Sequence, residues 1–156
     1  MHKAAIKVDR DGVWYFEGRK IIRQDILSLF YASLHLDEDR YYIEIDGERQ
    51  YLEVEDTVFL VQGAELVRDS EEAFVISLND GTEEKLDLHT FRIAEGNVPY
   101  CLVKGGRFPA RFLRLPFYQV AQHVLHDEET DEYFLLLNGK RIVLQARSQP
   151  LIRPNG

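Results

Sequence analysis

The sequence of 156 residues predicts an α+β protein of two related lobes, each a curved antiparallel sheet with one main helix. Three observations lead to this fold class. Short stretches of alternating apolar and polar residues recur along the chain between turn dipeptides, which is typical of antiparallel hairpins. Two stretches have the spacing of an amphipathic helix. The order of these elements then repeats once along the chain.

In the first half, strands over residues 5–9 and 13–16 flank the turn signal Asp11-Gly12. A helix is expected from Arg23 to Leu36, because apolar residues there follow the helical period. These residues are Ile26, Leu29, Phe30, Ser33 and Leu34. Strands follow over 41–45, 50–54, 57–61 and 65–67, and Gly63 is a candidate β-bulge between the last two.

In the second half, strands over residues 73–78 and 83–88 flank Asn79-Asp80-Gly81, the strongest hairpin signal of the chain. Strands over 91–93 and 100–104 follow, and Gly105-Gly106 turns the chain. Pro116 is expected as the first residue of a second helix, because proline fits the first helical position. Its buried stripe would be Phe117, Val120, Ala121, Val124 and Leu125. A hairpin over 133–137 and 141–145 closes around Asn138-Gly139.

The repeat rests on residues that recur at a nearly constant spacing. Gly18, Arg19 and Arg23 recur 88 positions later as Gly106, Arg107 and Arg111, and Tyr42-Ile43 and Gly47 recur 92 positions later as Phe134-Leu135 and Gly139. Glycine turns are common in β proteins, so chance similarity is the alternative to duplication. Duplication predicts two lobes, residues 1–67 and 68–156, packed as one unit. A cleft between two lobes is the usual place for a ligand.

Two longer patterns resemble a known bacterial family. Asp11-Gly12-x-Trp14-x-x-x-Gly18-x-x-Ile21-x-Arg23, an amphipathic helix and Val54-Glu55-Asp56-x-x-Phe59 resemble the first half of the family called domain of unknown function 1285. Pro99-Tyr100-x-x-Val103-Lys104-x-Gly106, Ala110 and Arg114-x-Pro116-Phe117-Tyr118 are similar to its second half. The resemblance implies a duplicated α+β fold whose second lobe is like a pleckstrin-homology barrel. It also implies a nucleotide-like ligand between the lobes and a role in signalling.

Charge is distributed unevenly along the chain. The net charge of −8 lies in residues 1–78, which hold 9 basic and 17 acidic residues, whereas residues 79–156 hold 10 of each. Between Arg92 and Arg114 there are five basic residues and one acidic residue, Glu95. The acidic total argues against long nucleic acids, which bind through a positive field. The positive charge of the basic segment is still compatible with binding a small anion.

We therefore expect a small phosphorylated or nucleotide-like ligand, because guanidinium groups match phosphate and carboxylate geometry. The expected ligand contacts are Trp14, Arg23, Lys104, Arg107, Arg111 and Arg114. In the alternative, these arginines pair with the acidic lobe and join the two halves. The corresponding functions are a ligand-binding or sensing protein, a protein–protein interaction scaffold without a ligand or, third, an uncharacterised enzyme.

No catalytic residue, cofactor or metal site is predicted. Carboxylates at Glu53 and Glu55 are more simply strand-edge groups than an acid–base pair. His123 and His126 stand three apart, but zinc sites need three or four ligands. Cys101 fits a buried, inert thiol. The sequence has no signal-peptide pattern and no apolar run near the ~18 residues of a membrane span, so we expect a cytoplasmic protein.

Overall fold

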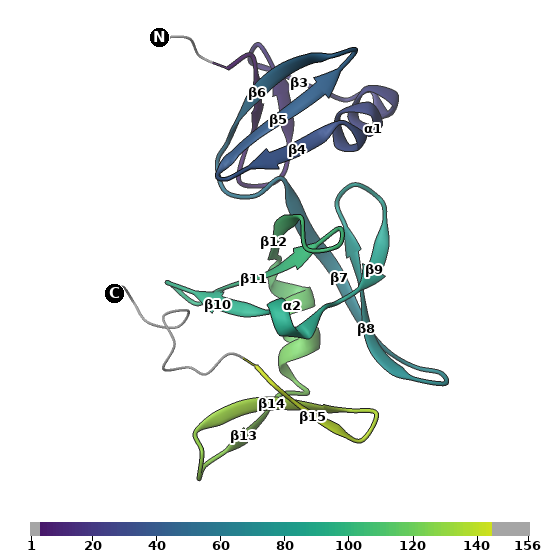
Figure 1. The fold of residues 1–156 in the computed structure, drawn as a ribbon, viewed down its shortest axis with the longest axis vertical. Coiled ribbons are helices and arrows are strands. Elements are labelled where there is room, and N and C mark those ends of the chain that lie inside the picture. Colours follow the sequence, from purple (N-terminus) through teal and green to yellow (C-terminus); the bar gives the residue numbers. More distant parts are fainter. Residues whose placement is uncertain (1–3, 145–156) are drawn as a thin grey trace. The chain divides into compact units, whose positions relative to one another are not determined.

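The computed structural model describes residues 4–144, and it divides the chain into two compact units, residues 1–59 and 60–156 (Figure 1). No helix among the described residues is long and apolar enough to cross a membrane.

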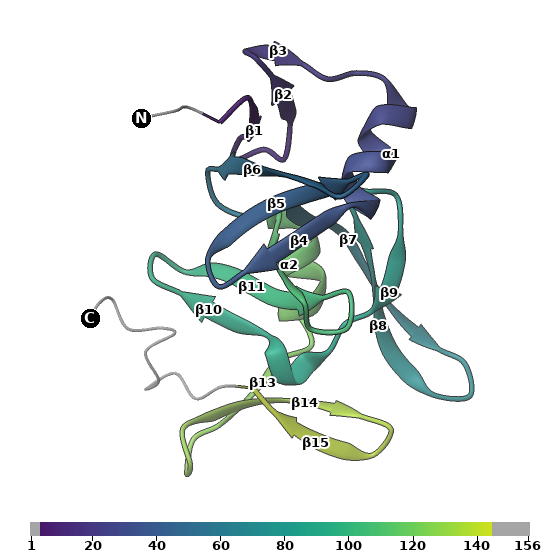
Figure 2. The ribbon, with the colours of Figure 1, turned by 45° about the horizontal axis from the view of Figure 1, so that its top comes forward.

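The first unit is a six-stranded sheet with one helix. Its elements are β1 (Ile6–Val8), β2 (Trp14–Phe16), β3 (Arg19–Lys20), α1 (Gln24–Ala32), β4 (Leu34–Asp37), β5 (Arg40–Ile45) and β6 (Glu48–Val54). The strand order is β3-β2-β1-β6-β5-β4. Strands β1 and β6 are parallel, and the other neighbours are antiparallel (Figure 2). Two antiparallel meanders are therefore joined through one parallel pair.

Helix α1 is shorter than the sequence pattern predicts. It ends at Ala32, and residues up to Leu36, which were expected to be helical, belong to β4. Leu34 and Leu36 pair with Ile43 and Tyr41 of β5. The apolar residues at positions 34 and 36 alternate with polar ones, so they also fit a strand. Backbone pairing with β5 makes this segment a strand and not a continuation of the helix.

The two faces of the first sheet differ in character. One face carries Trp14, whose ring lies 5.7 Å from that of Phe30 and 5.2 Å from that of Tyr31 on α1. The apolar core of the unit lies on this side, because side chains alternate along a strand. The opposite face carries Lys7 and Tyr15, which are paired across β1 and β2. Polar and charged groups thus occupy the face away from α1.

The second unit contains a six-stranded sheet, a helix and a smaller sheet. Its elements are β7 (Phe59–Arg68, starting at the last residue of the first unit), β8 (Glu72–Leu78), β9 (Glu83–Lys85), a 3-10 helix η1 (Leu88–Thr90), β10 (Arg92–Ala94), β11 (Val98–Val103), β12 (Phe108–Phe112), α2 (Arg114–Ala121), β13 (Leu125–Asp127), β14 (Glu132–Leu137) and β15 (Lys140–Val143). The large sheet has the order β10-β11-β12-β7-β8-β9. The predicted bulge is confirmed, because the β7–β8 register shifts between Val61 and Gly63.

Helix α2 begins earlier and ends earlier than expected. It starts at Arg114, so Pro116 is its third residue rather than its first. A proline is compatible with this third position, because the first four N–H groups of a helix have no partner within it and proline lacks only that group. The helix ends at Ala121, and Leu125 begins β13 with 45% of its surface exposed. The strand β12 was not predicted from the sequence.

The core of the second unit lies between its large sheet and α2. Buried side chains of β8, β11 and β12 alternate with half-buried or exposed ones. Cys101, Ala110 and Phe112 are among the buried group, and Val120 of α2 is fully buried. The strands β10, β11 and β12 therefore have one face toward the core and one face away from it.

The internal repeat is visible in two ways. The large sheets have the same strand order, since β3-β2-β1-β6-β5-β4 corresponds to β9-β8-β7-β12-β11-β10. A second, different correspondence relates the three-stranded meander after α1 to the one after α2, so that β5 and β6 match β14 and β15 instead of β11 and β12. Arg49 lies over the Tyr42 ring at 4.2 Å, and Arg141, 92 residues later, lies over the Phe134 ring at 4.0 Å. The predicted fold class, an α+β protein of two related lobes, is confirmed.

Candidate functional site

Trp14 is buried in the first unit, with 2% of its surface exposed. Its indole N–H has no hydrogen-bond acceptor among the described residues. A buried donor without an acceptor costs free energy, so this group is notable even though the ring itself packs against α1. Within the first unit, Trp14 is a core residue with one unsatisfied polar atom.

Arg23 directly precedes α1, and its guanidinium group is bound by Asp25. The Nη2–Oδ2 distance is 2.6 Å and the Nε–Oδ1 distance is 3.1 Å. The hydrogen bond from Arg23 lowers the pKa of the Asp25 carboxyl. Both side chains are exposed. Arg23 therefore already has a carboxylate partner two residues away.

Lys104 stands at the end of β11 and contacts the turn between β8 and β9. Its ammonium group donates to Asp80 Oδ2 at 2.7 Å and to Thr82 Oγ1 at 2.8 Å. Burial acts to raise the pKa of Asp80, but the hydrogen bonds from Lys104 and Thr82 outweigh it and lower that pKa. Lys104 thus joins two turns of the second unit.

Arg107 and Arg114 lie on either side of β12. The Nε of Arg107 donates to the Lys104 carbonyl at 3.1 Å, and its guanidinium lies 5.1 Å from the centre of the Phe108 ring. Arg114 is the first residue of α2 and is exposed. Arg107 therefore packs on its own turn, whereas Arg114 faces solvent.

Arg111 belongs to a row of three side chains that crosses β10, β11 and β12. Arg92 is paired with Tyr100, and Tyr100 is paired with Arg111. Directly paired residues present their side chains on the same face of a sheet. The guanidinium of Arg92 lies 4.8 Å from the centre of the Tyr100 ring. All three side chains are half-buried. We call these three residues the Arg–Tyr–Arg row.

The Arg–Tyr–Arg row lies on strands without any acidic residue. The sequences of β10, β11 and β12 are RIA, VPYCLV and FPARF. The sequence pattern identified this basic segment and Arg111, but it did not assign Arg92 and Tyr100 to the site. The strand β12 was missing from the prediction, so the pairing that aligns the three side chains was missing too.

Cys101 follows Tyr100 on β11, and its side chain lies on the opposite, buried face of the sheet. Burial, with the nearby charges of Glu84 and Asp87, raises the pKa of the Cys101 thiol to about 12. The thiol therefore stays protonated at neutral pH and is a poor nucleophile. Residues 4–144 contain no group of three or more His, Cys, Asp or Glu side chains placed to hold a metal ion.

Comparison with known proteins relates the first unit to a known sequence family. The sequence model described as domain of unknown function (DUF1285), N-terminal domain, matches residues 1–57. No curated protein matches the chain. A DUF1285 family protein from Silicibacter pomeroyi DSS-3 has a similar fold, with a TM-score of 0.75 and 22% identity. The alignment covers 97% of this chain and 84% of that protein.

A second solved structure has the same kind of similarity. It is a DUF1285 family protein from Shewanella baltica OS155, with a TM-score of 0.65 and 18% identity. This alignment covers 76% of this chain and 91% of that protein. At these identities the two structures bear on the fold alone. The pleckstrin-homology-like character of the second lobe stays a prediction.

Proposed function

We propose that this chain, whose residues 1–57 match the N-terminal domain of the DUF1285 family, is a ligand-binding protein. Its ligand is a small anion with a planar ring, such as a nucleotide, and its role is sensing rather than catalysis. The observation that carries this proposal is the Arg–Tyr–Arg row on β10, β11 and β12.

The arrangement of the row suits both parts of such a ligand. Guanidinium groups bind phosphate oxygens through two parallel hydrogen bonds, and this sheet face carries two of them, one on β10 and one on β12. The ring of Tyr100 lies between them in the strand order. Aromatic side chains stack with nucleic-acid bases, each stack contributing about 1–3 kcal/mol.

The local charge supports an anion at this face. Strands β10, β11 and β12 carry two arginines and no carboxylate. The chain as a whole has a net charge of −8, so this face is a local exception. A small anion at this face is attracted by the nearby arginines more than it is repelled by the distant acidic residues. Charges beyond a Debye length of about 8 Å are screened at physiological salt.

The row supports binding rather than proton transfer. Arginine stays protonated in proteins, and tyrosine titrates near pH 10. General acid–base catalysis near neutral pH favours histidine or a carboxylate, and the row contains neither. A protein that holds a ligand without transforming it is suited to sensing, because ligand binding stabilises the folded, ligand-competent state.

Arg111 and Arg114 are the two predicted contacts that this proposal retains. Arg111 is part of the row, and Arg114 follows it by three residues at the start of α2. Lys104 and Arg23 have carboxylate partners in their own units. Neither residue lies on β10, β11 or β12, so we place neither in the proposed site.

Isothermal titration calorimetry with nucleoside monophosphates, diphosphates and inorganic phosphate tests the proposal. We expect a nucleotide to bind and the affinity to fall at least about tenfold in the variants Arg92→Ala and Arg111→Ala. Tyr100→Leu should weaken nucleotide binding more than phosphate binding. Arg68→Ala removes a surface arginine that pairs with Glu72 on β8, and it is the matched control. Absence of nucleotide binding, or unchanged affinity in Arg111→Ala and Arg114→Ala, would overturn the proposal.

A further inference from the structure

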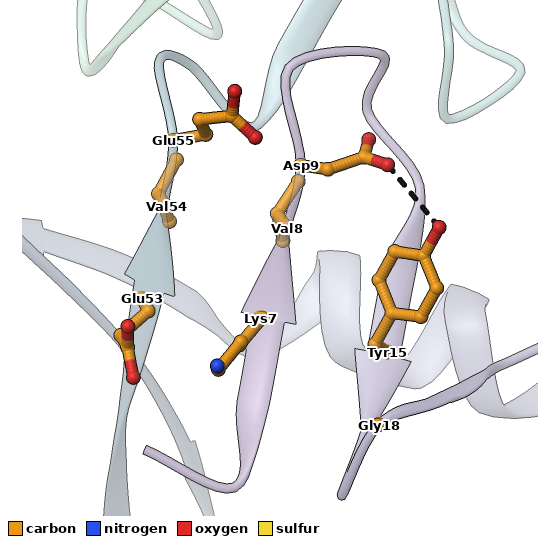
Figure 3. A pocket seen from close by; sticks show the side chains of 8 residues that line it. All are labelled: Lys7, Val8, Asp9, Tyr15, Gly18, Glu53, Val54 and Glu55. Atoms are coloured by element: carbon orange, nitrogen blue, oxygen red, sulfur yellow. Dashed lines mark hydrogen bonds between the residues drawn. The ribbon is translucent and has the colours of Figure 1, made fainter. Parts of the chain in front are cut away.

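A separate pocket of about 610 Å³ opens on the first unit, over strands β1, β2 and β6 (Figure 3). It lies within residues 7–55, so it contains no part of the Arg–Tyr–Arg row. Its volume is in the range of small-molecule sites, which is roughly 300–1,000 Å³. Its charged and polar lining residues are Lys7, Asp9, Tyr15, Glu53 and Glu55.

Strand pairing places the central side chains of this pocket in one row. Lys7 is opposite Tyr15 in the antiparallel β1–β2 pair and opposite Glu53 in the parallel β1–β6 pair. The three side chains therefore lie on one face of the sheet. This is the face away from α1, because Trp14 and Tyr15 are consecutive and point to opposite sides.

Hydrogen bonds from the backbone hold the carboxylates of the pocket in place. Oε1 of Glu53 accepts from the Ala4 N–H at 3.2 Å, and Oε1 of Glu55 accepts from the Arg10 N–H at 3.1 Å. Within the described residues, the second oxygen of each carboxylate has no hydrogen-bond donor. Each can therefore accept a hydrogen bond from a ligand without losing the bond that orients it.

Asp9 shapes the wall of the pocket rather than offering a free oxygen. Its Oδ1 accepts from the Asp11 and Val13 N–H groups at 2.9 and 3.0 Å, and its Oδ2 accepts from the Tyr15 hydroxyl at 3.2 Å. Partial desolvation, then the bond to Asp9, raises the pKa of Tyr15. The tyrosine hydroxyl is therefore held as a neutral donor beside the cavity.

The ammonium group of Lys7 contributes the opposite charge. Among residues 4–144 it has no ion pair, although it is opposite Glu53 in the strand register. Figure 3 shows it directed away from the end of the pocket where Glu55 and Asp9 lie. The cavity therefore has the carboxylates of Glu55 and Asp9 at one end, and the ammonium group of Lys7 beside the Glu53 carboxylate toward the other.

We propose that this pocket binds a small zwitterion, such as an amino acid or a short peptide with free termini. The ammonium group of the ligand contacts the free oxygen of Glu55, and its carboxylate contacts Lys7. A ligand with both charges satisfies both ends of the cavity, whereas a simple amine or a simple acid leaves one end unpaired. A zwitterion therefore gains a charge–charge attraction at both ends, whereas a probe with one charge gains only one.

An NMR titration of the full-length protein tests this site with glycylglycine and the common amino acids as probes. Ethylamine and acetate serve as probes that carry only one of the two charges. We expect at least one zwitterion to bind, and each single-charge probe to bind about tenfold more weakly or worse. The variants Lys7→Met and Glu55→Gln should each weaken zwitterion binding by a similar factor.

Two control variants separate the pocket from general charge effects. Lys20→Met removes the cross-strand neighbour of Tyr15, and Glu48→Gln removes a carboxylate of β6; neither residue lines the pocket. Both should leave zwitterion affinity unchanged. The proposal is overturned if no zwitterion binds at millimolar concentration, if ethylamine binds as tightly, or if a folded Lys7→Met protein keeps wild-type affinity.

Discussion

The ammonium nitrogen of Lys104 lies 2.7 Å from Oδ2 of Asp80, and this ion pair connects the end of β11 to the turn between β8 and β9. The two side chains are 21% and 7% exposed, so the pair is less screened by solvent than a surface pair. The backbone N–H of Lys104 also donates to the Glu84 carboxylate at 3.2 Å. Lys104 is thus placed to stabilise the second unit.

Replacing Lys104 should therefore destabilise the second unit. We expect Lys104→Met to lower the free energy of unfolding by roughly 1–3 kcal/mol, because it leaves the Asp80 carboxylate half-buried without its cation. Urea unfolding at pH 7 measures the change. Lys85→Met is the control, since Lys85 forms an exposed pair with Glu71 and should change stability by less than about 0.5 kcal/mol. Equal effects of the two substitutions would contradict this role.

The stabilising effect of the Lys104–Asp80 pair should also depend on pH. The pKa of Asp80 is lowered from 3.8 in the folded protein, so the carboxylate form is favoured by folding. Its contribution is fully present above pH 3.8 and is lost as the pH falls through the lowered pKa. The stability difference between wild type and Lys104→Met should therefore shrink in acid. A difference that persists unchanged at the lowest pH where both proteins fold would argue against this linkage.

Trp14 is the one tryptophan of the chain, and it should report on the first unit. Its burial against Phe30 and Tyr31 predicts native fluorescence at short wavelength that shifts to longer wavelength on unfolding. Trp14→Ala should cost about 3–5 kcal/mol, as for other buried large-to-small substitutions. Trp14→Phe should cost less, because it also removes the N–H donor that lacks an acceptor. A larger loss for phenylalanine than for alanine would be inconsistent with this packing.

The Cys101 thiol should be inert in the native protein. It is 1% exposed, and burial together with Glu84 and Asp87 raises its pKa to about 12. We expect a thiol reagent such as dithionitrobenzoate to react at pH 8 only after denaturant unfolds the chain. Absorbance at the wavelength of the released thiolate follows the reaction. Rapid stoichiometric labelling of the folded protein would show that the thiol is accessible and reactive.

Gly63 lies close to the side chain of Ser77 at the β-bulge of β7. A β-carbon at this position would lie 2.6 Å from the Oγ of Ser77, its partner on β8. We expect Gly63→Ala to destabilise the protein by about 1 kcal/mol or more, since overpacking forces neighbours to move. Ser77→Ala should restore most of the loss in the double variant. A double-mutant cycle of urea unfolding energies measures this coupling, and purely additive effects would contradict the proposed clash.

Much of the fold could be predicted from local sequence alone. The hairpin turns at 79–81 and 138–139 were identified correctly, because turn residues with special backbone angles determine where strands reverse. The end of α1 was misplaced, since the apolar residues 34 and 36 fit both a helix and a strand. The pairing of these residues with β5 makes them a strand, and a pattern of neighbouring residues in the sequence does not reveal such a pairing. The predicted last strand extended to Gln145, which lies outside the described residues.

The candidate site could be predicted only in part. The density of arginine between residues 92 and 114 is visible in the sequence, and it led to Arg111. The alignment of Arg92 and Tyr100 with Arg111 depends on the registers of two strand pairs. One of those strands, β12, contains Pro109 and was not recognised as a strand. The sequence also did not predict that Lys104 pairs with Asp80 or that Arg23 pairs with Asp25, because both pairs depend on side-chain positions in the folded chain.

The most direct test of the proposed function is a two-dimensional ¹H–¹⁵N NMR titration of the full-length protein with ADP. We predict saturable shifts concentrated at the backbone amides of Arg92, Tyr100 and Arg111. These shifts should be weaker in Arg111→Ala and unchanged in Arg68→Ala. Absence of saturable shifts, or shifts confined to residues away from β10, β11 and β12, would contradict the claim that the Arg–Tyr–Arg row is a ligand site.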